Sequence, residues 1–361
     1  MAALAGFAKQ QGSGKVDVTG TASSDTDGSV GLAAMNGGTI THTGGGDITV
    51  DGSASIGALG QSGGTVDITG GTIKATGGAF NTYAQGGTVK LNGTTINTEQ
   101  KSLAFYADNT GGTGKINFTG ATTANIAGGT DANTRGTAFY YKGSGYSPFT
   151  ASDIGTWASN TFGGTINNLT LNMASGSRLF IASDVSMNLS DTAGSGLTSS
   201  LGANIVGNDY KTFMLYLSKL SLNQNINLDN PTDAYNKLEI SNSSIENNNA
   251  NVITGKSTNK VAIAQENDTT LDRDKVKLVN SGTINLSGAN STAIYGKFAE
   301  ILNDTTGTIN VGANSAAIYG TTSSKLENKG TINLGANSVG IFSKGDTAAG
   351  YKISATTYKG L

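Results

Sequence analysis

Two aspartates of this chain are candidates for catalysis by a pair of carboxylates. Asp17 and Asp67 hold the same place in two similar segments, GKVDVTG and GTVDITG. Paired carboxylates would suit a glycosidase or polysaccharide lyase, and retaining hydrolysis needs them about 5 Å apart. The corresponding places in the neighbouring segments hold Thr41 and Lys90, and no arginine or histidine joins the two acids. We therefore predict no catalytic residues, and keep a carbohydrate-active enzyme as an alternative.

Metal and cofactor motifs are incomplete. Asp25-Thr26-Asp27-Gly28 begins like a calcium loop but lacks the later ligands and the closing glutamate. Gly44-Gly45-Gly46-Asp47 is a fragment of the calcium-binding nonapeptide repeat, without tandem copies. The chain has no cysteine, so thiolate ligands and disulfides are excluded. The sequence predicts no metal site and no cofactor.

The single histidine, His42, lies in the segment GTITHTG. Ile68 and Leu91 occupy the same place in later segments. We interpret His42 as a residue of the core or its rim rather than a base or a metal ligand.

Aromatic residues are the best candidates for binding. Short segments such as LAFY, TAFY, TAIY and VGIF share one pattern, with a small residue second and an aromatic residue fourth. If the segments are strands, alternation turns the second and fourth places outward and the first and third inward, as for Leu32, Phe105 and Val339. The fourth places are Tyr106, Tyr140, Tyr295, Tyr319 and Phe342. They predict one outer aromatic wall beside a groove of small residues, which either binds a partner or only stiffens the structure.

A second aromatic group interrupts the regular pattern between residues 144 and 162. It contains Tyr146, Phe149 and the only tryptophan, Trp157. We interpret this stretch as a loop or short helical excursion that projects from the main structure. For Trp157 we favour anchoring of the excursion over contact with a ligand.

These residues are positioned by a repeat. KLVNSGTINLSGANSTAIYG begins at Lys277, and the same unit is repeated from Glu300 and from Lys325. The glycines that open each GTIN block are Gly282, Gly307 and Gly330, which are 25 and 23 residues apart. A period of this length is typical of stacked architectures, in which each unit buries its apolar face against its neighbours.

Within each repeat the apolar period is two, as in Gly282-Thr283-Ile284-Asn285-Leu286, which indicates a strand with one buried side. Three such strands occur per repeat, separated by Gly and Asn, which accept positive φ at tight corners. The sequence therefore predicts an all-β parallel β-helix, a solenoid with 23–27 residues and three short strands per coil. The test is whether Ile284, Ile309 and Ile332 stack.

Earlier parts of the chain are looser copies. The first apolar residues of the segments at the N-terminal end are Val16, Ile40, Val66, Val89 and Ile116. Residues 191–210 suggest a second, longer loop, and Asp229 to Tyr235 a turn. The predicted divisions are 1–13 as an N-terminal cap or added residues, 14–143 as repeats, 144–162 as the excursion, 163–276 as irregular coils, and 277–361 as regular repeats, all in one continuous rod.

Composition restricts the partners. The formal net charge is −2, with 23 basic and 25 acidic residues, so no basic surface is expected to track nucleic acid phosphates. No run of 18 apolar residues could form a transmembrane helix. The first residues, MAALAGFAKQQGSG, lack the features of an intact signal peptide. We expect either a removed signal or a fragment of a longer chain.

The segments GTINLSGANSTAIYG, GTINVGANSAAIYG and GTINLGANSVGIFS resemble the passenger repeats of type V autotransporter adhesins, particularly large fusobacterial-type outer-membrane adhesins. The resemblance is strong over 277–344, fair over 14–143 and weak between them. It implies a right-handed parallel β-helix on the surface of a Gram-negative cell, tethered by a C-terminal β-barrel that is missing here. The family has no shared binding motif, so no site residue is transferred.

The expected function is therefore adhesion to a surface protein or glycan on a partner bacterium or host cell. Many weak contacts along a rod would act together through multivalent display. A carbohydrate-active β-helix enzyme and a self-associating passenger that causes autoaggregation are the alternatives.

Overall fold

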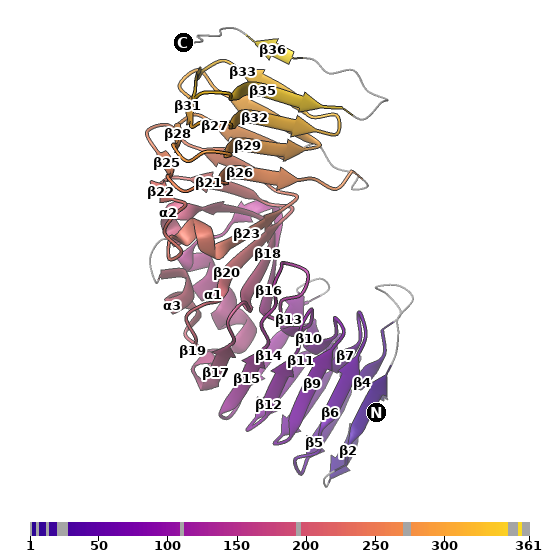
Figure 1. Cartoon of the computed structure of the whole chain (residues 1–361). Helices are drawn as coiled ribbons and strands as arrows, with labels where there is room; N and C mark the ends of the chain where they lie inside the picture. Colours follow the sequence, from indigo (N-terminus) through magenta and orange to yellow (C-terminus); the bar gives the residue numbers. More distant parts are fainter. Residues whose placement is uncertain are drawn as a thin grey trace. The chain divides into compact units, whose positions relative to one another are not determined.

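The computed structural model describes residues 2–4, 7–11, 14–19, 28–108, 112–192, 196–269, 276–345 and 353–355. Contacts divide the chain into two compact units. Unit 1 comprises Met1–Lys142, Ala151–Ala182 and Gly196–Met214, and unit 2 comprises Gly143–Thr150, Ser183–Ser195 and Leu215–Leu361. Each unit is a stack of coils (Figure 1). A single continuous rod remains a prediction.

Unit 1 is built from three parallel sheets. The first contains β1 (Ala2–Leu4), β4 (Val30–Met35), β7 (Ile56–Gln61), β10 (Phe80–Gln85), β13 (Leu103–Asp108) and the first part of β16 (Thr137–Pro148). The second contains β2 (Phe7–Gln11), β5 (Thr39–Thr43), β8 (Thr65–Thr69), β11 (Thr88–Asn92) and β14 (Lys115–Phe118). The third contains β3 (Val16–Thr19), β6 (Ile48–Asp51), β9 (Thr72–Thr76), β12 (Thr95–Thr98), β15 (Thr122–Ile126), β17 (Leu169–Met173) and β19 (Asn204–Val206).

Unit 2 repeats this plan. Its first sheet contains β21 (Lys219–Leu222), β24 (Ser244–Asn247), β27 (Val276–Asn280), β30 (Ala299–Asn303), β33 (Lys325–Asn328) and β36 (Ile353–Ala355). Its second contains β22 (Ile226–Asn227), β25 (Val252–Gly255), β28 (Thr283–Leu286), β31 (Thr308–Val311) and β34 (Thr331–Leu334). Its third contains β26 (Val261–Glu266), β29 (Thr292–Lys297), β32 (Ala316–Thr321) and β35 (Val339–Lys344). Strands β18 (Arg178–Asn188) and β20 (Lys211–Tyr216) contribute residues to both units, and β23 (Leu238–Ser241) pairs with β20.

The predicted stacking is confirmed. Ile284 lies in register with Ile309, and Ile309 with Ile332. In unit 1, Ile40, Val66, Val89 and Ile116 form an equivalent column that is fully buried. Because each coil buries these residues against the coils on either side, the fold is the predicted parallel β-helix with three strands per coil.

One part of the N-terminal alignment is wrong. Val16 does not precede Ile40 in its column, because β3 pairs with β6 and places Val16 beside Ile48 in the third sheet. Ala8 of β2 holds the place before Ile40, within the residues predicted as a cap. The segment GKVDVTG alternates apolar and polar residues, as strands of the second sheet and of the third sheet both do. Its sequence therefore could not show to which of the two sheets it belongs.

The predicted excursion contains helix α1 (Ala151–Phe162), which lies in unit 1 and packs against β14. A sheet edge exposes unpaired backbone groups, and the structure satisfies those of Phe118 with side chains that follow α1. The Phe118 amide donates to Thr165 Oγ1 at 3.1 Å, and Asn168 Nδ2 donates to the Phe118 carbonyl at 2.7 Å. Asn168 belongs to the short helix η1 (Ile166–Asn168). The excursion therefore covers the edge of the second sheet.

The other irregular segments are shorter than predicted. Residues 191–210 include the end of α2 (Leu189–Thr192), helix α3 (Gly196–Leu201) and strand β19, so a coil resumes where a loop was expected. Strand β19 pairs with β17 through Leu171 and Ile205. No helix in the described ranges is long and apolar enough to cross a membrane.

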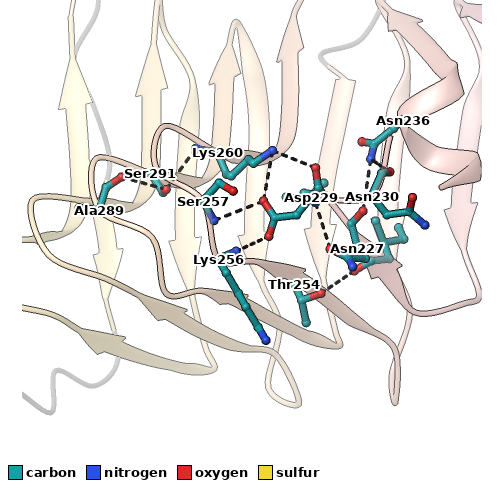
Figure 2. A network of polar contacts seen from close by, with 12 residues as sticks. Asn227, Asp229, Asn230, Asn236, Thr254, Lys256, Ser257, Lys260, Ala289 and Ser291 are labelled. Carbon is teal, nitrogen blue, oxygen red and sulfur yellow. Dashed lines mark hydrogen bonds and ion pairs between the residues drawn. The ribbon is translucent and has the colours of Figure 1, made fainter. Parts of the chain in front are cut away.

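The predicted turn between Asp229 and Tyr235 is confirmed, and its last residues enter the short helix η2 (Ala234–Lys237). Figure 2 shows the polar contacts around Asp229. The Asp229 carboxylate accepts hydrogen bonds from the backbone amides of Lys256 and Ser257, and its Oδ1 lies 3.3 Å from Lys260 Nζ. These bonds, led by the Lys256 amide, lower the pKa of Asp229. Because the carboxylate oxygens of Asp229 hold backbone amides of the next coil in place, this aspartate has a structural role.

Candidate functional site

The predicted aromatic wall exists as two separate ladders, one in each unit. The unit 1 ladder consists of Tyr83, Tyr106 and Tyr140, on β10, β13 and β16. The Tyr83 and Tyr106 rings stack with centroids 4.7 Å apart, and Tyr140 meets Tyr106 edge-on at 4.8 Å. All three side chains are partly exposed. Tyr83 was missed by the sequence analysis, although it lies 23 residues before Tyr106 at the fourth place of its strand.

The unit 2 ladder consists of Tyr295, Tyr319 and Phe342, on β29, β32 and β35. Its rings meet edge to face, with centroids 5.5 Å apart for the two tyrosines and 5.0 Å apart for Tyr319 and Phe342. The side chain of Phe342 is 44% exposed. Tyr295 donates its hydroxyl to Glu266 Oε1 at 3.1 Å. Burial and the Glu266 carboxylate raise the pKa of Tyr295, so its hydroxyl stays neutral.

The predicted groove of small residues is wrong. The alanines at the second place, Ala104, Ala138, Ala293 and Ala317, are fully buried. Strand pairing passes from Phe80–Leu103 directly to Thr82–Phe105, so the strand bends at the second place and turns it inward. At Gly57 an added Cβ would lie 2.6 Å from Ile73 Cγ2, which shows how little space this corner leaves. Simple alternation therefore fails at the bend.

The first place of these strands is also less uniform than predicted. Leu103 is buried, but Val339 is 44% exposed, and Val261 at the same place in β26 is 45% exposed. The third place agrees with the prediction, since Leu32, Phe105 and most of its equivalents are buried. Both valines add apolar surface to the outside, although Val339 was predicted to point into the core.

The aromatic residues of the predicted excursion belong to both units. Phe149 is fully buried in unit 2, where its amide donates to the Ser186 carbonyl at 3.0 Å. Tyr146, also in unit 2, is 38% exposed, and Lys219 Nζ lies 4.1 Å from the centre of its ring. Trp157 packs in unit 1.

Trp157 is half-buried among other rings, as anchoring requires. Its ring centroid lies 5.2 Å from Phe162, 5.7 Å from Tyr141, 5.8 Å from Phe180 and 5.9 Å from Phe139. These contacts attach α1 to the interior of unit 1. His42 is likewise a core residue: it is fully buried, pairs in register with Ile68, and its Nε2 lies 3.0 Å from the Gly46 carbonyl oxygen.

The acidic residues considered for catalysis lie in different sheets. Asp67 stands between Thr41 and Lys90 in the second sheet, and Asp17 pairs with Thr49 in the third. Within the described ranges, no cluster of three or more His, Cys, Asp or Glu side chains could hold a metal ion. The segment Asp25-Thr26-Asp27 lies outside the described residues.

Replacing Asp108 by asparagine tests the electrostatics of the unit 1 ladder. Burial, followed by the charge and hydrogen bond of Asp108, raises the pKa of Tyr83 to about 12, and burial also raises that of Tyr106. A raised folded-state pKa means that this contribution to stability is complete below pH 10 and is lost as pH rises toward 12. We expect Asp108→Asn to lower the pKa of Tyr83 toward 10 in an ultraviolet titration. A Tyr83 pKa that stays at about 12 in the variant would show that burial acts alone.

We compared the chain with protein-family models, with curated proteins and with solved structures, and none of the three comparisons gave a match.

Proposed function

We propose that this chain is a binding segment of a bacterial surface adhesin, displayed outside a Gram-negative cell as an autotransporter passenger, and that it has no catalytic role. Two features support the proposal: the stacked β-helical repeats that resemble such passengers, and an outer face in unit 2 that carries exposed apolar side chains. The second feature is the observation on which the proposal depends.

The unit 2 face is the outer side of β26, β29, β32 and β35. Strand register arranges its side chains in three rows that run across the four strands. The aliphatic row is Val261, Thr292, Ala316 and Val339, the aromatic row is Ala264, Tyr295, Tyr319 and Phe342, and the charged row is Glu266, Lys297, Thr321 and Lys344. An apolar centre beside a polar margin is the usual composition of a protein interface.

A protein surface suits this face better than a glycan. The most exposed side chains of this face, Val261, Val339 and Phe342, offer no donors or acceptors, so a glycan bound over them would leave its hydroxyls unpaired. Tyrosine and phenylalanine give large contact area at low entropic cost, which is why aromatic residues often dominate binding energy. We therefore propose a surface protein of a partner bacterium or host cell as the ligand.

Serine substitutions at Tyr319 and Phe342 test the proposal. Loss of these rings is expected to weaken attachment of the purified protein to partner bacteria or epithelial cells by about tenfold, since a binding-energy loss of 1.4 kcal/mol is tenfold in affinity. The matched control is Tyr83→Ser with Tyr106→Ser, which removes two of the three rings of the unit 1 ladder instead. Attachment that is unchanged in the folded Tyr319→Ser and Phe342→Ser variants would reject the unit 2 face.

Self-association is the second candidate, because the unit 2 face is complementary to itself. If a second copy faces it with strands in the same direction and coil order reversed, Val261 meets Val339, Ala264 meets Phe342 and Glu266 meets Lys344. Such reciprocal contacts are those of a two-fold interface. Sedimentation of the same variants separates the candidates, because only self-association predicts a dimer of the purified wild-type protein that Phe342→Ser abolishes.

A further inference from the structure

A hollow of about 520 Å³ opens on the outer side of the third sheet of unit 1, where β12, β15, β17 and β19 end. This volume is in the range of small-molecule sites. Small residues at the strand ends, Ala127, Ala174 and Gly207, make room for it. The hollow lies outside both aromatic ladders and was not predicted from the sequence.

A row of asparagine amides lines this hollow. Asn125 Nδ2 donates to Asn97 Oδ1 at 2.8 Å, and Asn172 Nδ2 donates to Asn125 Oδ1 at 2.8 Å. The three residues are in register, so their amides repeat at the strand spacing of about 4.8 Å. Each amide therefore has a fixed orientation before any ligand arrives.

The row keeps hydrogen-bonding capacity that the protein does not use. An asparagine amide has two N–H donors and an oxygen that accepts twice. Asn172 Oδ1 accepts no hydrogen bond from the described residues, because Val206 replaces the next asparagine of the row. At the other end the neighbour of Asn97 is Lys74, which pairs with Glu99 at 3.4 Å. Donors and acceptors thus face the hollow together.

Most of the exposed lining of the hollow is apolar, and the hollow carries no net charge. Val206 is 50% exposed, and Met173 and Ile126 lie beside it with only slight exposure. The Glu99 carboxylate at the rim is balanced by Lys74. A ligand that fits must be neutral, must both donate and accept hydrogen bonds at short intervals, and must offer some C–H surface to Val206.

We propose that the asparagine-lined hollow of unit 1 binds a neutral saccharide. Sugar hydroxyls donate and accept in the way that the unused amide groups require, and the C–H side of a sugar ring contacts Val206. The site is separate from the unit 2 face, so this proposal does not depend on a protein partner there.

The test uses the complete chain labelled with ¹⁵N and titrated with lactose, cellobiose, maltose and N,N′-diacetylchitobiose, with digalacturonate as a charged counterpart. At least one neutral disaccharide is expected to shift the side-chain amide resonances of Asn97, Asn125 and Asn172 saturably, and digalacturonate is expected to bind more weakly. If no neutral disaccharide shifts these resonances, or if digalacturonate binds more tightly, the proposal is overturned.

Variants distinguish binding from a structural role of the row. Asn172→Leu is expected to weaken saccharide binding about tenfold, the effect of one lost hydrogen bond of typical strength. Asn333→Leu is the matched control, since Asn333 likewise ends the described part of an outer asparagine row, in unit 2, where its Nδ2 donates to Asn310 Oδ1 at 2.7 Å. Equal binding by wild type and folded Asn172→Leu would reject the site.

Val206→Asn gives a second test, which can be used even if the Asn172→Leu variant does not fold. The new amide would continue the row, donate to Asn172 Oδ1 and remove the apolar contact. Thermal stability is expected to be kept while saccharide binding falls. Binding that stays at the wild-type level would contradict the proposal.

Discussion

Replacing Phe139 by alanine is expected to destabilise unit 1 by about 3–5 kcal/mol, the usual cost of emptying a buried phenylalanine site. Phe139 is fully buried, and its ring centroid lies 5.4 Å from Phe105 and 5.2 Å from Phe180 on neighbouring coils. It also lies 5.7 Å from Phe162 and 5.9 Å from Trp157 of α1. The loss of one ring would thus loosen the coil stack and the attachment of the helix together.

The single tryptophan makes this prediction measurable. In Phe139→Ala the emission of Trp157 is expected to shift to longer wavelength, because water reaches the ring, and the denaturant midpoint falls. Tyr140→Ala is the matched control on the adjacent, partly exposed residue, with a loss of about 1 kcal/mol or less. Equal losses of stability in Phe139→Ala and Tyr140→Ala would show that the buried ring of Phe139 contributes no more packing energy than the partly exposed ring of Tyr140.

Replacing Asn303 by alanine is expected to destabilise unit 2 by about 2–4 kcal/mol, through buried polar groups left without partners. A buried ladder of asparagines lies at one corner of the coils and consists of Asn247, Asn280, Asn303 and Asn328. Each Nδ2 donates to the Oδ1 of the next asparagine at 2.8 Å. Asn303 accepts from Asn280 and donates to Asn328 and to the Gly307 carbonyl. Its removal therefore leaves groups on both neighbouring coils unsatisfied.

Asn247→Ala is the control, because Asn247 ends the ladder. Its Oδ1 is buried without a partner, and Leu222 stands in register on the preceding coil. Its loss leaves only the Asn280 oxygen unpaired, so we expect a cost of about 1–2 kcal/mol. Chemical denaturation of both variants decides the question. A cost for Asn247→Ala that equals or exceeds that for Asn303→Ala would contradict a cooperative ladder.

The sequence predicted the stacking of coils well because a stack repeats one constraint many times. Each apolar residue of GTIN must lie over its equivalent, so Ile284 and Ile309 could be paired from their spacing alone. Val16 was misplaced because β3 lacks a clear mark of its sheet. The aromatic residues were found, but their division into two ladders depends on which strands pair, which local pattern does not show.

The candidate surfaces were less predictable than the fold. The hollow of unit 1 depends on Val206 following Asn172 across strands, and these residues are separated by a stretch that includes α3. The cover over β14 depends in the same way on Thr165 and Asn168 reaching back to Phe118. Such contacts join segments without sequence similarity, so no repeat indicates them.

By itself the sequence determined the fold class, the three strands of each coil and the column of inward residues, because periods of two and of 23–27 residues leave few other arrangements. Only the tertiary structure decided which remaining side chains meet solvent. Ala293 at the predicted outer wall is fully buried, whereas Val339 at a predicted core place is 44% exposed. The physical reason is that exposure depends on the bend of each strand and on the coils beside it, and residues far apart in the chain set both.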